Sequence, residues 1–315
     1  MKRLLTLTIG LIFSASLLSF AGSEKERKWS KTYSINSGAI LELESSFGDI
    51  RMETWDKNEI YVEITFVVQG KSESDVDKAL AKCEVDANGS SSLVSIETST
   101  GNGSWGNKIE KMETNIIIKA PSSIGLDLDH RFGDASFPLL EGNVTLDIQH
   151  GDIRIEGMED ANNEIELAFS DAIFGSIYGA KMDIQHSDVK IRSIEALNMD
   201  NQFSDIKIKE LGVKLFLDCQ HGDVDIYKVG PKMKEIMIDI QFGDVTMELD
   251  ESVAWKLEGD LSFSSISLPD GVNKRRSDED KDWSNSFEIQ AFHGENGEAT
   301  IEIDAQHSSV DIRFE

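Results

Sequence analysis

The sequence predicts an all-β fold with one short helix, built as a single-stranded parallel β-solenoid with about 18–21 residues per coil. Two observations carry this prediction: a short phrase recurs at a nearly fixed interval, and apolar residues alternate with polar ones on both sides of it. Self-similarity at a short period is typical of stacked-repeat proteins. A strand-helix-strand unit needs roughly 30 residues, which this interval does not provide.

The recurring phrase is an aromatic or imidazole ring followed by Gly or Ser and then Asp. Between Phe132 and Phe263 the rings follow one another at steps of 17 to 21 residues. Eight full copies occur, at Phe47-Gly48-Asp49, Phe132-Gly133-Asp134, His150-Gly151-Asp152, Phe169-Ser170-Asp171, His186-Ser187-Asp188, Phe203-Ser204-Asp205, His221-Gly222-Asp223 and Phe242-Gly243-Asp244. Two decayed copies follow, at Phe263-Ser264-Ser265 and His307-Ser308-Ser309.

Residues 1–21 are interpreted as a secretory signal peptide. Lys2 and Arg3 give a positive start, residues 4–20 are mostly apolar, and Ser19 and Ala21 suit cleavage after Ala21. An uncleaved anchor is the alternative, although the apolar run falls short of the roughly 20 residues that a spanning helix needs. We therefore predict an exported protein that resides in the periplasm, at the cell surface or outside the cell.

Residues 22–125 are interpreted as a β-rich segment that packs as the start of the solenoid. Strand-like alternation runs over residues 29–66 and returns at 93–97 and 115–119. A helix is predicted near residues 72–83, because one helical face gathers Val76, Ala79, Leu80 and Cys83. Its N-cap is expected at Ser72 or Ser74.

Residues 126–315 carry the β-solenoid repeats. Each copy alternates apolar and polar residues up to the ring, bends over two residues, and then alternates again, as in residues 146–155. Period two on both sides of the bend predicts two short strands per repeat, each with one buried face. A charged stretch near 270–286 is expected to be a loop between coils. The last coil, with strands near 287–291, 299–304 and 310–314, is expected to cap the open end.

The phrase is interpreted first as a structural corner. Alternation places each ring on the inward face, Gly or Ser lets the backbone turn tightly, and Asp accepts hydrogen bonds from N–H groups left unpaired at the bend. The predicted structural repeat positions are Phe47, Gly48, Asp49, Phe132, Gly133, Asp134, His150, Gly151, Asp152, Phe169, Asp171, His186, Asp188, Phe203, Asp205, His221, Gly222, Asp223, Phe242, Gly243, Asp244 and His307.

Two metal-binding alternatives compete with this interpretation. With one repeat per coil at a strand spacing of about 4.8 Å, the phrase histidines lie about 10 Å apart, too far to share an ion; two repeats per coil would stack them. Calcium would relieve the repulsion between the stacked phrase aspartates, but the glycine-rich nonapeptide of calcium-binding β-rolls is absent. We predict no cofactor and no metal ligand, with calcium as the alternative.

Two further rows precede the ring in each repeat. Acidic residues recur at Asp147, Asp183, Asp200, Asp218, Asp239 and Asp304, and amides at Gln149, Gln185, Gln202, Gln220, Gln241 and Gln306. We interpret the first row as a solvated face with the same calcium alternative, and the second as a structural ladder or a ligand-contact strip. No convergent carboxylate cluster and no catalytic motif stands out, so no catalytic residue is predicted and the chain is not expected to be an enzyme.

Charge excludes one class of partner. The chain has 58 acidic and 31 basic residues and a formal net charge of -27, which repels nucleic acid and anionic lipid. No transmembrane segment is predicted after signal cleavage. Export would permit a disulfide between Cys83 and Cys219. However, Cys219 occupies the slot that isoleucine fills in sister repeats, which favours a buried thiol.

The chain resembles the putative adhesin family of bacterial exported and cell-envelope proteins, a domain of unknown function. The matching pairs are Gly48-Asp49, Gly133-Asp134, Gly151-Asp152, Gly222-Asp223 and Gly243-Asp244. The acidic helix and the Pro just before the repeats are also similar, so the resemblance covers nearly all of the mature chain. It differs in the ring, where that family commonly has Ser. The resemblance implies a β-solenoid with no catalytic residues to transfer.

These observations together predict an exported, non-enzymatic β-solenoid that serves as an adhesin-like interaction or scaffold module at the bacterial cell envelope. It would present rigid acidic faces to a protein or glycan partner. Two alternatives stay open, because fold does not imply function. One is a carbohydrate-active enzyme on a β-helix scaffold, and the other is a periplasmic envelope-stress or signalling component.

Overall fold

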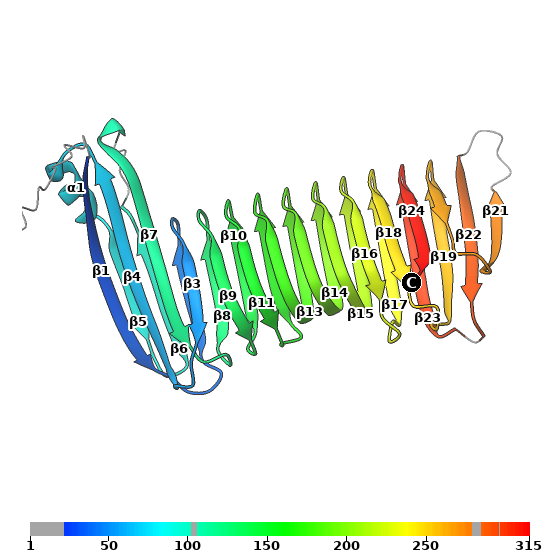
Figure 1. Ribbon diagram of the computed structural model, residues 1–315, viewed down its shortest axis with the longest axis horizontal. Coiled ribbons are helices and arrows are strands. Elements are labelled where there is room, and N and C mark those ends of the chain that lie inside the picture. The colour runs from blue at the N-terminus through cyan, green and yellow to red at the C-terminus, as the bar shows by residue number, and fades with distance from the viewer. Residues whose placement is uncertain (1–21, 102–105, 279–284, 296) are drawn as a thin grey trace, which may run out of the picture.

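The protein is an elongated β-solenoid made of two facing sheets (Figure 1). The computed structural model describes residues 22–101, 106–278, 285–295 and 297–315. Neighbouring coils pair in parallel, each giving one strand to each sheet, and each coil holds one copy of the phrase. The predicted fold class is confirmed. The predicted signal peptide at residues 1–21 lies outside the described residues.

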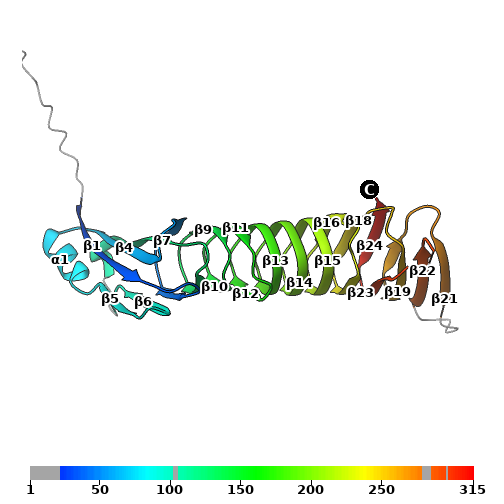
Figure 2. The same ribbon diagram turned by 90° about the horizontal axis from the view of Figure 1, so that it is seen from below.

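We call the sheet that holds the strands before each ring sheet I, and the sheet that holds the strands after each ring sheet II. Three long strands turn from sheet II into sheet I without a break: β13 (Ala172–Gln185), β14 (Val189–Gln202) and β15 (Ile206–Gln220). Figure 2 shows them in the middle of the solenoid.

Sheet I runs in space from β5 to β21. Its strands in order are β5 (Glu84–Gly89), β6 (Leu93–Ser99), β2 (Ile40–Ser45), β8 (Gly125–His130), β10 (Val144–Gln149), β12 (Asn163–Ala168), the second halves of β13, β14 and β15, then β17 (Glu235–Gln241), β23 (Ala299–Gln306), β19 (Trp255–Ser262), β22 (Ser286–His293) and β21 (Asn273–Asp278).

Sheet II runs in space from β1 to β20. Its strands in order are β1 (Ser23–Ser34), β4 (Glu59–Gly70), β7 (Ile109–Ala120), β3 (Ile50–Thr54), β9 (Ala135–Leu140), β11 (Ile153–Met158), the first halves of β13, β14 and β15, then β16 (Val224–Val229), β18 (Asp244–Leu249), β24 (Ser309–Phe314) and β20 (Ser265–Ser267).

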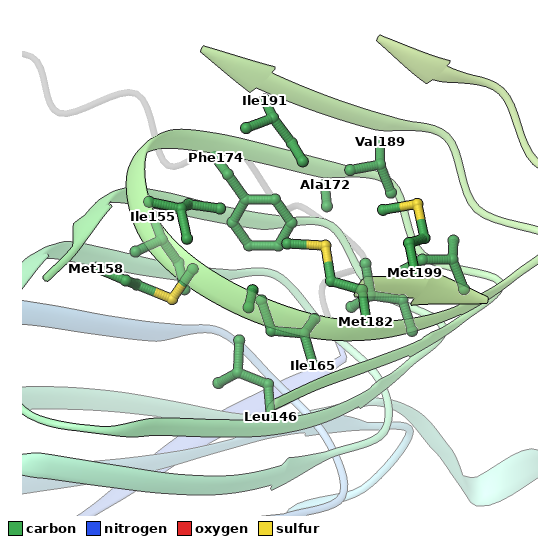
Figure 3. Close-up of a cluster of buried hydrophobic side chains, with 14 of the residues drawn as sticks. Leu146, Ile155, Met158, Ile165, Ala172, Phe174, Met182, Val189, Ile191 and Met199 are labelled. Carbon is green, nitrogen blue, oxygen red and sulfur yellow. The ribbon is translucent and has the colours of Figure 1, made fainter. Parts of the chain in front are cut away.

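The core is one continuous apolar layer between the two sheets. Alternate residues of every strand point inward, so that Ile155 of β11 pairs in register with Phe174 of β13. Figure 3 shows these side chains facing Leu146, Ile165 and Met182 from the opposite sheet. All five are at most 1% exposed. Each coil therefore buries its apolar face against its neighbours rather than alone.

The N-terminal end is closed by antiparallel strands and one helix. Strands β1, β4 and β7 pair antiparallel, and α1 (Glu73–Leu80) packs on β1 and β4 through Val76, Ala79 and Leu80. The Ser72 hydroxyl oxygen accepts the Asp75 N–H at 3.2 Å and caps the helix. The helix thus lies within the predicted range, and Ser72 is its N-cap.

The order of the coils differs from the sequence at both ends. The coil β23–β24 lies between β17–β18 and β19–β20, and the coil β2–β3 lies between β6–β7 and β8–β9. The prediction that the last coil caps the open end therefore holds only for its strand near 287–291, which is β22, and is wrong for β23 and β24, which lie within the stack. The antiparallel pair β21–β22 covers that end, because it adds strands to the edge of β19.

The predicted charged loop near 270–286 is also wrong in part. Residues 273–278 form β21, which pairs antiparallel with β22. The reason is that the edge of β22 offers unpaired backbone groups to any adjacent extended segment, whatever its charge. Residues 279–284 of the predicted loop lie outside the described residues.

Candidate functional site

A ladder of ten stacked rings runs along the corner where sheet I turns into sheet II, and we call it the ring ladder. Neighbouring ring centroids lie 4.8–5.2 Å apart and the ring planes deviate by 6–15°. In spatial order the rings are Phe47, Phe132, His150, Phe169, His186, Phe203, His221, Phe242, His307 and Phe263.

The rings point to solvent, so the prediction that they point inward is wrong. Phe169 is 56% exposed and Phe203 is 52% exposed, and every histidine of the ladder is exposed. Eight of the ten rings have φ between 52° and 60°, in the left-handed region. This conformation breaks the strand alternation one residue early, so that the ring faces outward. The following residue takes the inward place, and Ser170 and Ser187 are each only 2% exposed.

The small residue of each phrase closes the corner from inside. The Ser170 N–H donates to Ser187 Oγ, and the Ser187 N–H donates to Ser204 Oγ, both at 2.8 Å. Ser187 Oγ in turn donates to the Gln185 carbonyl at 2.8 Å. Glycine serves elsewhere because the coils approach closely: a Cβ on Gly222 would lie 2.0 Å from the Ser204 carbonyl oxygen. Ser and Gly are thus both small enough for the inward place at the corner, where adjacent coils pack closely.

Seven of the eight phrase aspartates accept a hydrogen bond from the next coil. In these seven, Oδ1 accepts the backbone N–H of the equivalent residue in the adjacent coil, as Asp171 does from Asp188 at 3.1 Å. The acceptors in these bonds, which span 2.9–3.2 Å, are Asp49, Asp134, Asp171, Asp188, Asp205, Asp223 and Asp244. Among the described residues no three His, Cys, Asp or Glu side chains gather as a metal site.

A second acidic row lies on the outer face of sheet I. It extends the predicted row to twelve carboxylates in register: Glu97, Glu44, Asp129, Asp147, Glu166, Asp183, Asp200, Asp218, Asp239, Asp304, Asp260 and Glu288. Partial burial, followed by repulsion from Asp218 and Asp304, raises the pKa of the Asp239 carboxyl. Burial and Asp260 raise the pKa of Asp304. At Asp239 and Asp304, burial and the neighbouring carboxylates therefore disfavour the ionised form.

The predicted amide row lies between the acidic row and the ring ladder. Gln185, Gln202, Gln220, Gln241 and Gln306 pair in register across successive strands. Two of the amides donate within their own strand, Gln149 to Asp147 at 3.2 Å and Gln185 to Asp183 at 3.4 Å. Amide, ring and phrase carboxylate thus form three parallel rows around one corner of the solenoid.

Sequence reasoning missed a basic surface on sheet II. Lys190 and Arg192 of β14 lie beside Lys207 and Lys209 of β15, and all four side chains are exposed. We call these four residues the basic patch. Alternation in Lys190-Ile191-Arg192 and Lys207-Ile208-Lys209 is the signal that could have revealed it, because period two puts both cations of each strand on one face.

Beside the basic patch, at the edge opposite the ring ladder, lies a groove of about 580 Å³. Its lining includes Ser176, Tyr178, Ser193 and Glu195, over the buried side chains of Ile177, Ile194 and Leu211. Tyr178 is 59% exposed. Arg192 Nη2 donates to Ser176 Oγ at 2.8 Å, which joins the basic patch to the groove.

Two cysteines and one histidine are buried in the interior. Cys83 and Cys219 are both buried and free, and burial raises the pKa of each thiol. The Cys219 prediction is confirmed. Sequence reasoning missed His130, which replaces isoleucine in the inward slot; its ring nitrogens lie 3.2 and 3.1 Å from the carbonyls of Ser45 and Gly133. Burial lowers the pKa of His130.

In the part of the chain that the structure describes, no helix has the length and apolar character needed to cross a membrane.

Comparisons with known proteins give one family match and several similar solved structures. The family model Toastrack DUF4097 matches residues 38–313. Curated proteins gave no match. Similar solved structures include a putative cell adhesion protein from Clostridium sporogenes, with 12% identity, coverage of 92% of this chain and 100% of that chain, and a TM-score of 0.22. A putative adhesin from Bacteroides fragilis has 12% identity, coverage of 91% and 97%, and a TM-score of 0.41. A putative lipid binding protein from Parabacteroides distasonis has 9% identity, coverage of 90% and 96%, and a TM-score of 0.36.

Proposed function

The chain belongs to the Toastrack DUF4097 family, and we propose that it is an exported, non-enzymatic binding module that presents its ring ladder to a protein or glycan partner at the bacterial cell envelope. The family supports an adhesin-like or scaffold role at a coarse level. The partner, the export and the absence of catalysis are the finer parts of the proposal. Export is supported by the signal-like composition of residues 1–21.

The ring ladder is the observation that carries the proposal. A left-handed residue with a side chain costs about 1–2 kcal/mol, and glycine would take the same conformation without that cost. Stacking offsets it, since each ring pair contributes about 0.5–1.5 kcal/mol. The two contributions are of similar size, so a ring gains little stability over glycine at this corner. Strained residues that persist at a surface are typical of functional sites.

Exposure supports the same conclusion. The six phenylalanines of the ladder, from Phe47 to Phe263, are 43–56% exposed on one continuous edge. Large exposed apolar arrays mark interaction sites in soluble proteins. Because the ring faces are stacked on one another, the ladder offers ring edges, with an amide row on one side and a carboxylate row on the other. Such a strip can contact apolar groups and hydrogen-bond polar groups of one extended partner.

The experiment compares two glycine variants of the mature chain, residues 22–315. The double variant Phe203→Gly/His221→Gly removes two adjacent rings at positions where glycine suits the backbone. The matched control is Tyr227→Gly, which removes an equally exposed ring from the outer face of sheet II, 51% exposed against 52% for Phe203. Binding to a glycan array and to isolated envelope fractions is measured for the wild type and both variants, together with product release from the bound polysaccharides.

We expect the double variant to lose at least tenfold in binding while the wild type and the Tyr227→Gly variant bind alike and release no product. Equal binding by the double variant and the wild type contradicts a role for the ladder. Turnover of a polysaccharide contradicts the non-enzymatic assignment and favours a carbohydrate-active enzyme.

A further inference from the structure

The basic patch places like charges directly opposite one another. Lys190 of β14 pairs in register with Lys207 of β15, and Arg192 lies beside Lys209 in the same way. Adjacent strands are about 4.8 Å apart, and alternate residues of one strand about 7 Å. Four cations thus form a small rectangle on the outer face of sheet II, where Figure 1 shows β14 and β15 side by side.

The described part of the protein forms no ion pair to this rectangle, although Asp225 of β16 lies in register beside Lys207. None of the four cations forms an ion pair with any other described residue, and the one hydrogen bond among their side chains runs from Arg192 to Ser176. Like charges directly opposite on adjacent strands destabilise a sheet. In a chain with a net charge of -27, acidic partners for these lysines are plentiful. The arrangement therefore favours an anion from outside the molecule.

The groove beside the patch has the chemistry of a sugar site. It lies where β13, β14 and β15 turn smoothly between the sheets, while residues 159–162 and 230–234 form longer connections on either side. An exposed Tyr178 offers a ring face, and Ser176 and Ser193 offer hydroxyls. Three glutamates offer acceptors, at Glu159, Glu195 and Glu210. A few polar groups around an aromatic surface are what fix the orientation of a small polar ligand.

The carboxylates near the patch restrict the kind of anion. Asp225 of β16 pairs in register with Lys207. Asp188 and Asp205 lie two residues before Lys190 and Lys207, and Glu210 follows Lys209. A polymer with a charge on every unit, such as a nucleic acid or polyphosphate, would meet these carboxylates as well as the cations. A glycan with carboxylates on some sugars and hydroxyls on the others can bind next to both the cations and the carboxylates. Its carboxylates pair with the cations, and its hydroxyls donate to aspartate and glutamate.

We propose that the basic patch and the adjoining groove form a binding site for an acidic, uronate-containing glycan chain. The uronate carboxylates lie on Lys190, Arg192, Lys207 and Lys209, and a neighbouring sugar stacks on Tyr178. This inference rests on the proposed function as a binding module, and it commits that function to one partner class on a surface separate from the ring ladder.

The test uses a hyaluronan octasaccharide, in which uronate alternates with a neutral sugar, and a neutral chitin oligosaccharide of the same length. Binding is measured by calorimetry on the mature chain at 50 and 300 mM NaCl, together with the melting temperature. The variants are Lys190→Glu, Tyr178→Ala, the double ring variant Phe203→Gly/His221→Gly, and the control Lys256→Glu, an exposed lysine on sheet I.

We expect the wild type to bind the uronate octasaccharide, more weakly at the higher salt, and to bind the neutral oligosaccharide at least tenfold more weakly. The Lys190→Glu change should weaken uronate binding at least tenfold yet leave the melting temperature unchanged or higher, because the introduced carboxylate would face Lys207. A merely structural lysine would not move binding and stability in opposite directions. Tyr178→Ala should weaken uronate binding several-fold, and Lys256→Glu should change uronate binding little.

The proposal is overturned if the two oligosaccharides bind alike, if Lys190→Glu binds as the wild type does, or if a linear polyphosphate displaces the uronate chain and binds more tightly. The double ring variant separates the two proposals. Uronate binding that survives in it supports a separate site. An absence of uronate binding in the wild type removes this inference and leaves the ring-ladder proposal to be judged by its own partners.

Discussion

Substitution of Phe203 tests the physical account of the ring ladder most directly. The Phe203 ring stacks between His186, at 4.9 Å and 10°, and His221, at 4.8 Å and 7°, and its backbone has a φ of 58°. Two terms therefore act at one residue: stacking on two faces stabilises the fold, and the left-handed backbone costs energy. Alanine removes the stacking and keeps the backbone strain, whereas glycine removes both the stacking and the strain.

The magnitudes decide the order of stability. Loss of two stacked contacts costs about 1–3 kcal/mol. Glycine then recovers about 1–2 kcal/mol of backbone strain and loses about 0.5–1 kcal/mol through its freedom in the unfolded chain. We therefore expect Phe203→Ala to be the least stable form and Phe203→Gly to lie between it and the wild type. This reverses the usual order in strands, where alanine is preferred to glycine.

Urea unfolding followed by circular dichroism and by tryptophan fluorescence measures the order. Coincident transitions are needed so that the midpoints report one cooperative event. The account of backbone strain is refuted if alanine is as stable as glycine at this position. The account of stacking is refuted if alanine is as stable as phenylalanine. Asn, which tolerates the left-handed region, provides a third point between Gly and Ala.

Three further predictions concern the rows beside the ladder and the core. Asp171→Ala should cost about 1 kcal/mol by leaving the Asp188 N–H without its acceptor, and Asp171→Asn should cost less because its amide oxygen still accepts; thermal melts compare the two. The pKa of Asp239 is raised in the folded state, so its ionised form destabilises the fold and its penalty disappears as the pH falls through that pKa. Asp239→Asn should therefore raise the melting temperature by about 1–2 °C at pH 7 and not at pH 3, and a lower melting temperature at pH 7 would contradict this. Buried thiols with raised pKa values should make Cys83 and Cys219 unreactive toward a disulfide reagent in the native protein and fully reactive in urea without reductant; a failure to react in urea would indicate a disulfide.

The coil could be predicted from the sequence because its determinants are local. An interval near 18 residues with period two on each side of a bend leaves room for two strands and two turns, and little else. The same locality predicted the helix at residues 73–80 and the buried Cys219. In each of these cases, the residues that specify the structure lie within one repeat of each other.

The direction of the rings could not be predicted by counting alternate residues. Alternation assumes extended backbone up to the bend, but His150 and its equivalents already have a positive φ. A large aromatic residue rarely adopts the left-handed backbone conformation, so the residue type did not indicate the positive φ. The inward place belongs to the small residue that follows, and the recurrence of Gly or Ser after each ring was the available clue.

The basic patch was missed for a different reason. The total charge of -27 averages over two sheets whose outer faces differ. Twelve carboxylates line sheet I, whereas four cations gather on two strands of sheet II. A search for runs of consecutive charges does not find the patch, because residues that are 17 apart along the chain become neighbours across strands. Only the alternation within each strand, compared between the two repeats, indicates it.

The sequence of ring types follows spatial order rather than chain order. Along the chain, Phe242 and Phe263 are consecutive and His307 comes last, which would place two phenylalanines together. In space His307 lies between them, at 5.1 Å from Phe242 and 4.9 Å from Phe263. Phenylalanine and histidine therefore alternate without a break from Phe132 to Phe263. The inserted coil β23–β24 could have carried either ring. Its histidine lies between two phenylalanines, which indicates that the ring type at each position depends on the rings that stack on it. The ladder is thus a feature of the folded surface, and its alternation is a second reason, beside the backbone strain, to treat that surface as functional.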